Sequence, residues 1–223
     1  MKVSLSVVDQ ISTEQISQIK SLVASATQLD EMAPLSEHVL IHINLGDGVA
    51  DQHILATADS GQLVGYLHLD LRDEVSGPVV EVVVHPEFRG RSIGTQLVEL
   101  AMDRLHDNRL RLWAHGELMG SYALAKKLGF TKARELWQMR RSLYAELPKL
   151  ELPADCQIKK FNAGTDNANW LALNAKVFAD HPEQGRLDET GLNIRIKENW
   201  FKPEGFLIST DNHGNFTGYN WTK

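Results

Sequence analysis

The sequence predicts an α/β protein of the α+β kind, with strands and helices alternating along 223 residues. Two observations support this fold class. Short runs rich in β-branched and aromatic residues alternate with segments whose apolar residues recur at helical spacing. Apolar residues make up 43% of the chain and charged residues 23%, which is typical of a folded globular protein. This length suits one large domain or two small ones.

The first elements are expected to be a strand, two helices and a hairpin. In chain order they are Lys2–Asp9, Thr13–Leu29, Leu35–Ile43, Ile54–Ala58 and Leu63–Leu71. The first helix has Ile16, Ile19 and Leu22 on one face, and Ser12 or Thr13 can cap its start. The two hairpin strands are joined by Asp59-Ser60-Gly61-Gln62, a polar turn with a glycine.

The next elements alternate between strand and helix. In order they are the strand Pro78–His85, the helix Ile93–Leu105, the strand Leu110–Ala114, the helix Leu118–Leu128 and an extended segment, Lys132–Leu143. Pro78–His85 is strongly β-branched, and Ile93, Leu97 and Leu100 lie on one face of the helix that follows. Gly129 is expected to end the fourth helix.

After Leu147–Pro153, which contains two prolines and is expected to be a linker, the pattern starts again. The expected elements are Gln157–Phe161, Asn167–Phe178, Glu189–Trp200, Phe206–Thr210 and Phe216–Trp221. We therefore predict a first domain over residues 1–146, a linker over 147–153 and a second domain over 154–223.

The second domain looks like a repeat of the first. Each contains a hairpin whose second strand carries Gly-Tyr, and 153 residues separate Gly65 from Gly218. The same separation relates Thr13 to Asp166, where the two first helices are expected to start. The alternative is that any two hairpins look alike. Because few residues follow the second Gly-Tyr, we expect either a fragment or a second domain that something else covers.

Composition excludes several classes of protein. The formal net charge is −6 and no long basic run occurs, so no nucleic-acid partner is expected. No apolar run approaches the ~20 residues of a membrane span, and the first residues are not expected to be a secretory signal. The single cysteine, Cys156, excludes an intrachain disulfide and a multi-cysteine metal site. We expect a cytoplasmic monomeric enzyme with a small-molecule substrate and no metal, membrane or nucleic-acid partner.

The most informative stretch is Val80–Val98, where a buried strand leads through a Gly- and Arg-rich loop into a helix. This arrangement directs backbone N–H groups and the positive end of the helix towards one point, which suits an anion such as pyrophosphate. Glycine lets the anion approach the backbone, and Arg89 and Arg91 add positive charge. The alternative is a strand–helix turn that binds nothing.

The segment Val84-His-Pro-Glu-Phe-Arg-Gly-Arg-Ser-Ile-Gly94 resembles motif A of the GNAT superfamily of N-acetyltransferases. The resemblance implies a mixed, mostly antiparallel sheet flanked by helices, followed here by a partial second GNAT-like domain, and acetyl-CoA as the acetyl donor. By position, Val82, Val83 and Val84 would face the pantetheine arm. The residues that would hold the pyrophosphate are Gly90, Arg91, Ser92, Ile93, Gly94 and Thr95. Ser92 replaces a signature glycine, so a left-handed backbone there would be strained.

Further motifs resemble the mycothiol synthase family of tandem GNAT enzymes. They are Leu112-Trp-Ala-His-Gly-Glu117, Arg134–Arg141, Ala179-Asp-His-Pro-Glu-Gln-Gly185, Trp200–Phe206 and Trp221-Thr-Lys223. This resemblance implies acetyl transfer to the cysteinyl amine of a cysteine–glucosamine–inositol pseudo-disaccharide, with the second domain catalytic. It also implies that Glu37, Glu183 and Lys223 contact the substrate.

Catalytic residues are harder to assign. Glu81 is the only carboxylate on the expected binding strand, and it is either a general base or a structural carboxylate. The tyrosine that many GNAT enzymes use as the acid is replaced by Ala125, with Tyr122 three residues earlier. His115 is a metal ligand, a base or a structural histidine near the groove, and no second ligand lies at suitable spacing in the sequence.

Three functions follow from these patterns. The first is acetyl-CoA-dependent N-acetyl transfer of the mycothiol synthase type, inactive if the chain is truncated. The second is a non-catalytic acyl-CoA-binding protein. The third is a GNAT enzyme that acetylates another small primary amine.

Overall fold

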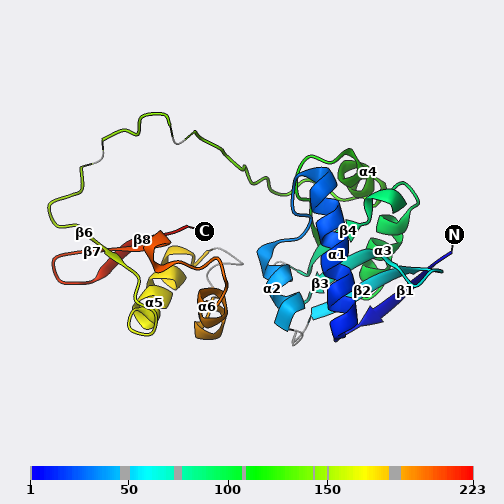
Figure 1. Cartoon of the computed structure of the whole chain (residues 1–223), viewed down its shortest axis with the longest axis horizontal. Coiled ribbons are helices and arrows are strands. Elements are labelled where there is room, and N and C mark those ends of the chain that lie inside the picture. Colours follow the sequence, from blue (N-terminus) through cyan, green and yellow to red (C-terminus); the bar gives the residue numbers. More distant parts are fainter. Residues whose placement is uncertain are drawn as a thin grey trace. The chain divides into compact units, whose positions relative to one another are not determined.

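The computed structural model describes residues 2–45, 51–72, 77–106, 109–142, 144–149, 151–180 and 187–222. They form two compact units, Met1–Trp137 and Gln138–Lys223 (Figure 1). We call these the first unit and the second unit. The domain boundaries expected from the sequence stay a prediction. Within the described ranges, no helix has both the length and the apolar character needed to span a bilayer.

The first unit is built on a five-stranded sheet. Its strands are β1 (Val3–Val8), β2 (Asp51–Ala58), β3 (Leu63–Asp70), β4 (Val79–Val84) and β5 (Arg111–Trp113). They lie in sequence order, antiparallel except for the parallel pair β4 and β5. The tight turn at 59–62 makes β2 and β3 antiparallel, whereas a helical crossover separates β4 from β5. The expected mixed, mostly antiparallel sheet is confirmed.

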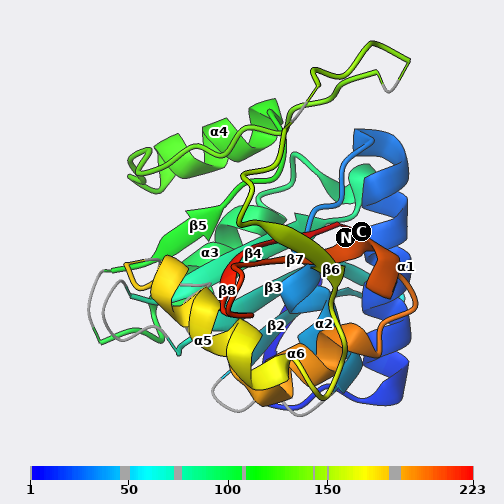
Figure 2. The ribbon, with the colours of Figure 1, turned by 90° about the vertical axis from the view of Figure 1, so that its left-hand side faces the viewer.

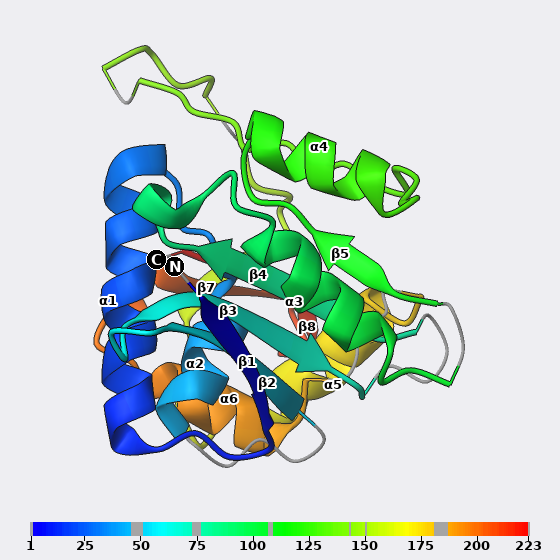
Figure 3. The ribbon, with the colours of Figure 1, turned by 90° about the vertical axis from the view of Figure 1, so that its right-hand side faces the viewer.

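Helices cover both faces of this sheet. Helices α1 (Thr13–Asp30) and α2 (Glu37–Leu45) bury Ile19, Leu22 and Val39 with Tyr66 of β3. On the other face, α3 (Ile93–Met102) buries Ile93, Leu97 and Val98 against Ile54 and Leu67, and Figure 3 shows α3 crossing the sheet. A fourth helix, α4 (Met119–Lys127), adds Leu124 to that second cluster.

Gly65 allows α3 to approach the sheet closely. A Cβ atom at this position would lie 3.0 Å from Ile93 Cγ2 and 3.0 Å from Leu97 Cδ1. Both side chains belong to the buried face of α3. The glycine of the first Gly-Tyr pair therefore sets how close the first turns of α3 come to β3.

The second unit has a three-stranded sheet with two helices. Its strands are β6 (Gln157–Lys160), β7 (Phe206–Thr210) and β8 (Phe216–Trp221), and its helices are α5 (Asn167–Val177) and α6 (Glu189–Ile196). Strand β7 lies between β6 and β8 (Figure 2). The core is aromatic: Phe206 stacks on Trp221 with ring centres 4.2 Å apart, and Trp170 of α5 meets Phe206 edge-on.

The two units share their strand register as well as their order of elements. In β1–β2–β3, Ala56 pairs with Leu5 and Gly65, and in β6–β7–β8, Ser209 pairs with Ile158 and Gly218. Each residue of the first set lies 153 positions before its counterpart. A register shift follows Ala56 in β2 and Ser209 in β7. A chance resemblance of two hairpins does not require the same bulge in the same place, so the register supports internal duplication.

Three expectations differ from the structure. The helix expected over Glu189–Trp200 ends at Ile196. The described part of Lys132–Leu143 joins neither sheet, and Trp137 and Met139 are 80% and 89% exposed. This segment carries five charged residues, and β-propensity decides little where no neighbouring strand is available to pair. The helix expected over Ile93–Leu105 ends at Met102, since Asp103 and Arg104 form a turn.

Candidate active site

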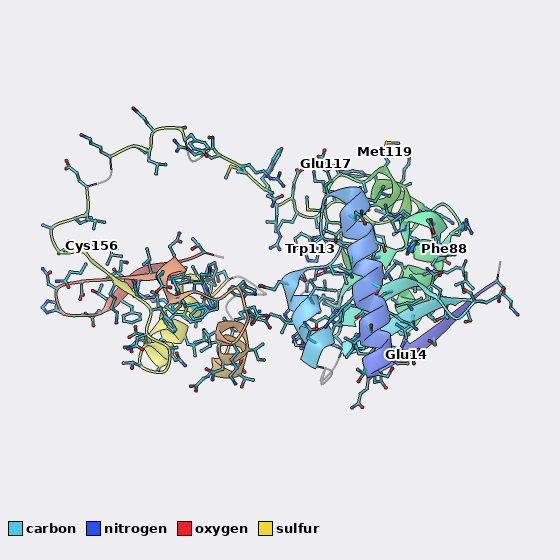
Figure 4. The ribbon with its side chains drawn as sticks, in the orientation of Figure 1. Glu14, Phe88, Trp113, Glu117, Met119 and Cys156 are labelled. Carbon is cyan, nitrogen blue, oxygen red and sulfur yellow. The ribbon has the colours of Figure 1, made fainter. Side chains whose placement is uncertain are left out.

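Strands β4 and β5 separate in the middle of β4. They pair at only three positions, and the last pair joins Glu81 to Trp113, where β5 ends (Figure 4). Beyond this point Val82, Val83 and Val84 pair with β3 alone within the described residues. The edge of β4 that faces away from β3 is therefore open over the three valines expected to face pantetheine, although their role stays a prediction.

The loop after β4 leads to the start of α3. A short 3₁₀ helix, η1 (Pro86–Phe88), is followed by Gly90 with a φ of 73° and Ser92 with a φ of 62°. The strained left-handed backbone expected at Ser92 is present. The first bond of the helix runs from the Gln96 N–H to the Ser92 carbonyl at 3.0 Å. The N–H groups of Ile93, Gly94 and Thr95 precede this bond, so they are available to an anion.

The two loop arginines have other partners. Arg89 donates from Nη1 and Nη2 to the two carboxylate oxygens of Asp30, each at 2.7 Å, and from Nε to the Val84 carbonyl at 3.1 Å. Its charge is therefore neutralised by α1, which corrects the expectation that it adds charge for an anion. Arg91 lies over the ring of Phe88, 5.3 Å from the ring centre, and donates to the Glu87 carbonyl.

Glu81 lies at the point where the strands separate. Its side chain is buried, and its Oε2 accepts hydrogen bonds from the Ser36 backbone N–H at 2.5 Å and from His115 Nε2 at 3.0 Å. Burial raises the pKa of Glu81, but the hydrogen bonds from His115 and Ser36 outweigh it and hold the pKa below its ordinary value. The ionised form of this β4 carboxylate is therefore favoured, and it accepts from Ser36, the residue before α2.

The pairing of Glu81 with His115 was not expected from the sequence, because 34 residues separate them. Parallel pairing of β4 with β5 brings Trp113 opposite Glu81, and the chain then places His115 two residues further on. A βαβ crossover read from the sequence would have identified the end of β5 as a neighbour of β4. His115 is one-quarter exposed, so it can be reached from solvent.

The remaining expected site residues are not all brought together. Glu37 begins α2 directly after Ser36 and is partly buried, so it lies near Glu81 in the fold. Glu183 and Lys223 lie outside the described residues. Tyr122 is 58% exposed and stands about 200° around α4 from Leu124, which packs into the core. Tyr122 is therefore directed away from the hydrophobic core of the first unit.

The site has no cysteine or metal cluster among the described residues. Cys156 is a free, partly exposed cysteine just before β6 (Figure 4). Among the described residues, no group of three or more His, Cys, Asp or Glu side chains is arranged to hold a metal ion.

Comparisons with known proteins agree with this geometry. Residues 18–130 match the Acetyltransferase (GNAT) family model. A mycothiol acetyltransferase from Acidothermus cellulolyticus is 47% identical over 91% of this chain and 62% of its own length. One from Salinispora arenicola is 40% identical over 96% of this chain and 69% of its own. The chain spans about three-fifths of the length of the relatives from Acidothermus cellulolyticus and Streptosporangium roseum.

A solved structure shares the fold across both units. It is a GCN5-related N-acetyltransferase from Sphaerobacter thermophilus, with a TM-score of 0.67 and 21% identity, and the match covers 96% of this chain and 70% of that one. At this identity the likeness supports the fold alone.

Proposed function

Since this chain belongs to the GNAT family of acetyltransferases, we propose that it is an acetyl-CoA-dependent N-acetyltransferase whose first unit binds the acetyl donor. The observation that carries this proposal is the junction of the open β4 edge with the start of α3. The Val82–Val84 edge offers backbone groups to a pantetheine arm. The N–H groups of Ile93, Gly94 and Thr95 offer donors to a pyrophosphate.

The reaction is transfer of an acetyl group to a primary amine. The amine nitrogen attacks the thioester carbonyl, a C–N bond forms, the C–S bond breaks, and coenzyme A leaves as a thiolate that takes up a proton. The amine must lose a proton to attack. Because the relatives are called mycothiol acetyltransferases, we propose the cysteinyl amine of a cysteine–glucosamine–inositol pseudo-disaccharide as the acceptor. Glu37 at the start of α2 is our candidate contact for this polar acceptor.

A second candidate function is binding of acyl-CoA without catalysis. One observation favours it: Ala125 stands at the position where many GNAT enzymes carry the tyrosine that acts as the acid. Under this proposal the first unit binds acetyl-CoA and no coenzyme A thiol is released in the presence of amine.

The test of the donor site is calorimetric titration of acetyl-CoA into three proteins. A Cβ atom at Gly94 would lie 3.6 Å from Val84 Cγ2 and 3.7 Å from Leu124 Cδ1, which are ordinary contacts. Gly94→Ala is therefore the matched control and should bind like the wild type. The longer Gly94→Gln side chain must enter the space beside the β4 edge, and we expect at least a tenfold loss, about 1.4 kcal/mol.

Equal affinity of the wild type and the Gly94→Gln variant would reject this donor site. The acceptor is tested by incubating the chain with acetyl-CoA and the cysteinyl pseudo-disaccharide, with glucosamine as a second amine, and measuring thiol release. Binding without release with either amine would favour the acyl-CoA-binding function.

A further inference from the structure

Glu81 joins three segments of the first unit that lie far apart in the sequence. It belongs to β4, and its Oε2 accepts hydrogen bonds from the Ser36 N–H at 2.5 Å and from His115 Nε2 at 3.0 Å. Ser36 directly precedes α2, and His115 follows the end of β5. The Glu81 side chain is only 7% exposed, so little water competes for these bonds. This carboxylate therefore ties the start of α2 and the end of β5 to the same point of β4.

The start of α2 depends on this contact for one of its bonds. In a capping box, the backbone N–H of the residue before a helix is bonded by a Glu or Gln side chain three residues further on. In α2 that position is Val39, whose side chain cannot accept a hydrogen bond, and Glu81 fulfils this role from β4. Ser36 supplies the other half of the box, because its Oγ accepts from the Val39 N–H at 3.4 Å. The negative charge of Glu81 is also favourable at the positive end of α2.

His115 holds the other side of the same carboxylate. An ionised carboxylate accepts hydrogen bonds only, so the imidazole donates from Nε2. The next residue, Gly116, lies against the connection between α1 and α2, since a Cβ atom at Gly116 would lie 3.6 Å from Met32 Cγ. The segment after β5 thus packs beside the connection that leads to Ser36. Through Glu81, the three segments are fixed relative to one another at the place where β4 and β5 separate.

Glu37 is the residue whose position this arrangement sets. It is the first residue of α2 and directly follows Ser36, so fixing the Ser36 N–H fixes the backbone from which Glu37 projects. On the other side, Glu81 directly precedes Val82, where the open edge of β4 begins. Glu81 therefore relates the candidate acceptor contact to the strand edge proposed for the donor. A misplacement of about 1 Å between reacting partners can cost about 10²-fold in rate.

We propose that Glu81 is a positioning residue for acceptor recognition, and that its bond to the Ser36 N–H sets the place of Glu37 relative to the Val82–Val84 edge. This inference rests on the proposed function, which takes Glu37 as a contact of the acceptor. Glu81 touches neither the acceptor nor the reacting atoms, and it takes up no proton during transfer. The ligand that Glu37 would recognise is a polar molecule with hydroxyl groups and a cationic amine, since a carboxylate accepts from both. The first unit thus contributes to acceptor binding whichever unit performs the transfer.

The contact is tested first without any ligand, by hydrogen exchange. Glu81→Met keeps the length of the side chain but offers no acceptor oxygen, and Glu81→Gln keeps one oxygen without the charge. We expect the Ser36 amide to exchange at least about tenfold faster in Glu81→Met, with Glu81→Gln between this variant and the wild type. The amides of β2 should keep their rates, which would show that the sheet is intact. Ser36→Ala, which keeps the backbone N–H and loses only the hydroxyl, is the matched control.

The consequence for the acceptor is tested by titrating the cysteinyl pseudo-disaccharide into the chain with acetyl-CoA present, and following the Glu37 amide in ¹H–¹⁵N spectra. We expect Glu81→Met to weaken acceptor binding at least tenfold, about 1.4 kcal/mol. Glu81→Gln should recover part of this loss. The affinity for acetyl-CoA should not change, because the backbone groups of Val82–Val84 remain. Glu14→Gln, at an exposed glutamate of α1, is the charge control and should bind both ligands like the wild type.

A double variant separates positioning from general stability. Glu37→Gln removes the proposed contact, and after this change Glu81 has no acceptor contact left to position. Glu81→Met combined with Glu37→Gln should therefore bind the acceptor no more weakly than the weaker of the two single variants. Additive losses, or an unchanged acceptor affinity in Glu81→Met, would overturn this inference and leave the proposed function standing.

The outcomes for the wild type separate the two proposals. An unchanged exchange rate of the Ser36 amide in Glu81→Met would overturn the inference whether or not the acceptor binds. A wild type that binds acetyl-CoA but shows no saturable acceptor shift at Glu37 would instead reject the proposed acceptor contact and this inference together. Faster exchange, weaker acceptor binding and a non-additive double variant would together support it.

Discussion

The contact between Asp30 and Arg89 joins the end of α1 to the loop before α3, and its loss should destabilise the first unit. Two guanidinium nitrogens reach the two carboxylate oxygens at 2.7 Å, and a third nitrogen reaches the Val84 carbonyl at 3.1 Å. The Asp30 side chain is 6% exposed and that of Arg89 34%. Replacing Arg89 would leave a buried carboxylate at the negative end of a helix without its partner.

The expected loss in the free energy of unfolding on replacing Arg89 lies between two limits. Exposed ion pairs contribute about 0–1 kcal/mol, and removing one partner of a fully buried pair costs about 3–5 kcal/mol. With one partner buried and the other one-third exposed, Arg89→Met should cost about 2–3 kcal/mol. Arg89→Lys keeps the charge but cannot form the two parallel bonds, so it should recover only part of this loss. Asp30→Asn combined with Arg89→Met should cost less than the sum of the single changes.

The assay is urea unfolding of the wild type, Arg89→Lys, Arg89→Met, Asp30→Asn and the double variant. Unfolding is monitored by hydrogen exchange at the amides of β2 and β3, so that only the first unit is measured. The free energy of unfolding should fall in the order wild type, Arg89→Lys, Arg89→Met. A cost of Arg89→Met below about 0.5 kcal/mol, or additive losses in the double variant, would refute the coupling of Asp30 to Arg89.

Two further predictions concern stability. Ser92→Gly should raise the urea midpoint of the first unit by the equivalent of about 1 kcal/mol, because Ser92 has a φ of 62° and makes no capping bond with its side chain; a lower midpoint would contradict this. Burial lowers the pKa of both His42 and His53 from 6.5 to about 4, so the unfolded chain binds more protons between these values. The free energy of unfolding should therefore fall as the pH is lowered from 6.5 towards 4, and His53→Gln should flatten this slope in urea titrations at pH 7, 6 and 5. Equal or greater stability at pH 5 would be inconsistent with burial of the neutral imidazoles.

Features that depend on neighbouring residues could be predicted from the sequence. The hairpin of β2 and β3 and the strand–loop–helix at β4 and α3 follow from local patterns of β-branched residues, turns and helix starts. The left-handed backbone at Ser92 was expected because this serine replaces a signature glycine of the family motif. The duplicated hairpin was also visible, because Gly65 and Gly218 occupy the same place in a bulged pair. Local patterns did not predict that the strands of the two sheets would pair in the same register.

Contacts between distant residues could not be predicted in this way. Arg89 and Asp30 are 59 residues apart, and Glu81 is 45 residues from Ser36. Each contact depends on which helix covers which face of the sheet, and this is set by tertiary packing rather than by local preference. Local preference also fails for Trp137 and Met139, whose segment was expected to be extended but has no partner strand among the described residues.

The most direct test of the account is a ¹H–¹⁵N spectrum of the chain titrated with acetyl-CoA. We predict saturable shifts of the backbone amides of Gly90 and Ser92–Thr95, with smaller shifts at Val82–Val84. The amides of β6, β7 and β8 should stay unchanged. Shifts confined to the second unit, or no saturable shift at the start of α3, would contradict the claim that the first unit binds the acetyl donor.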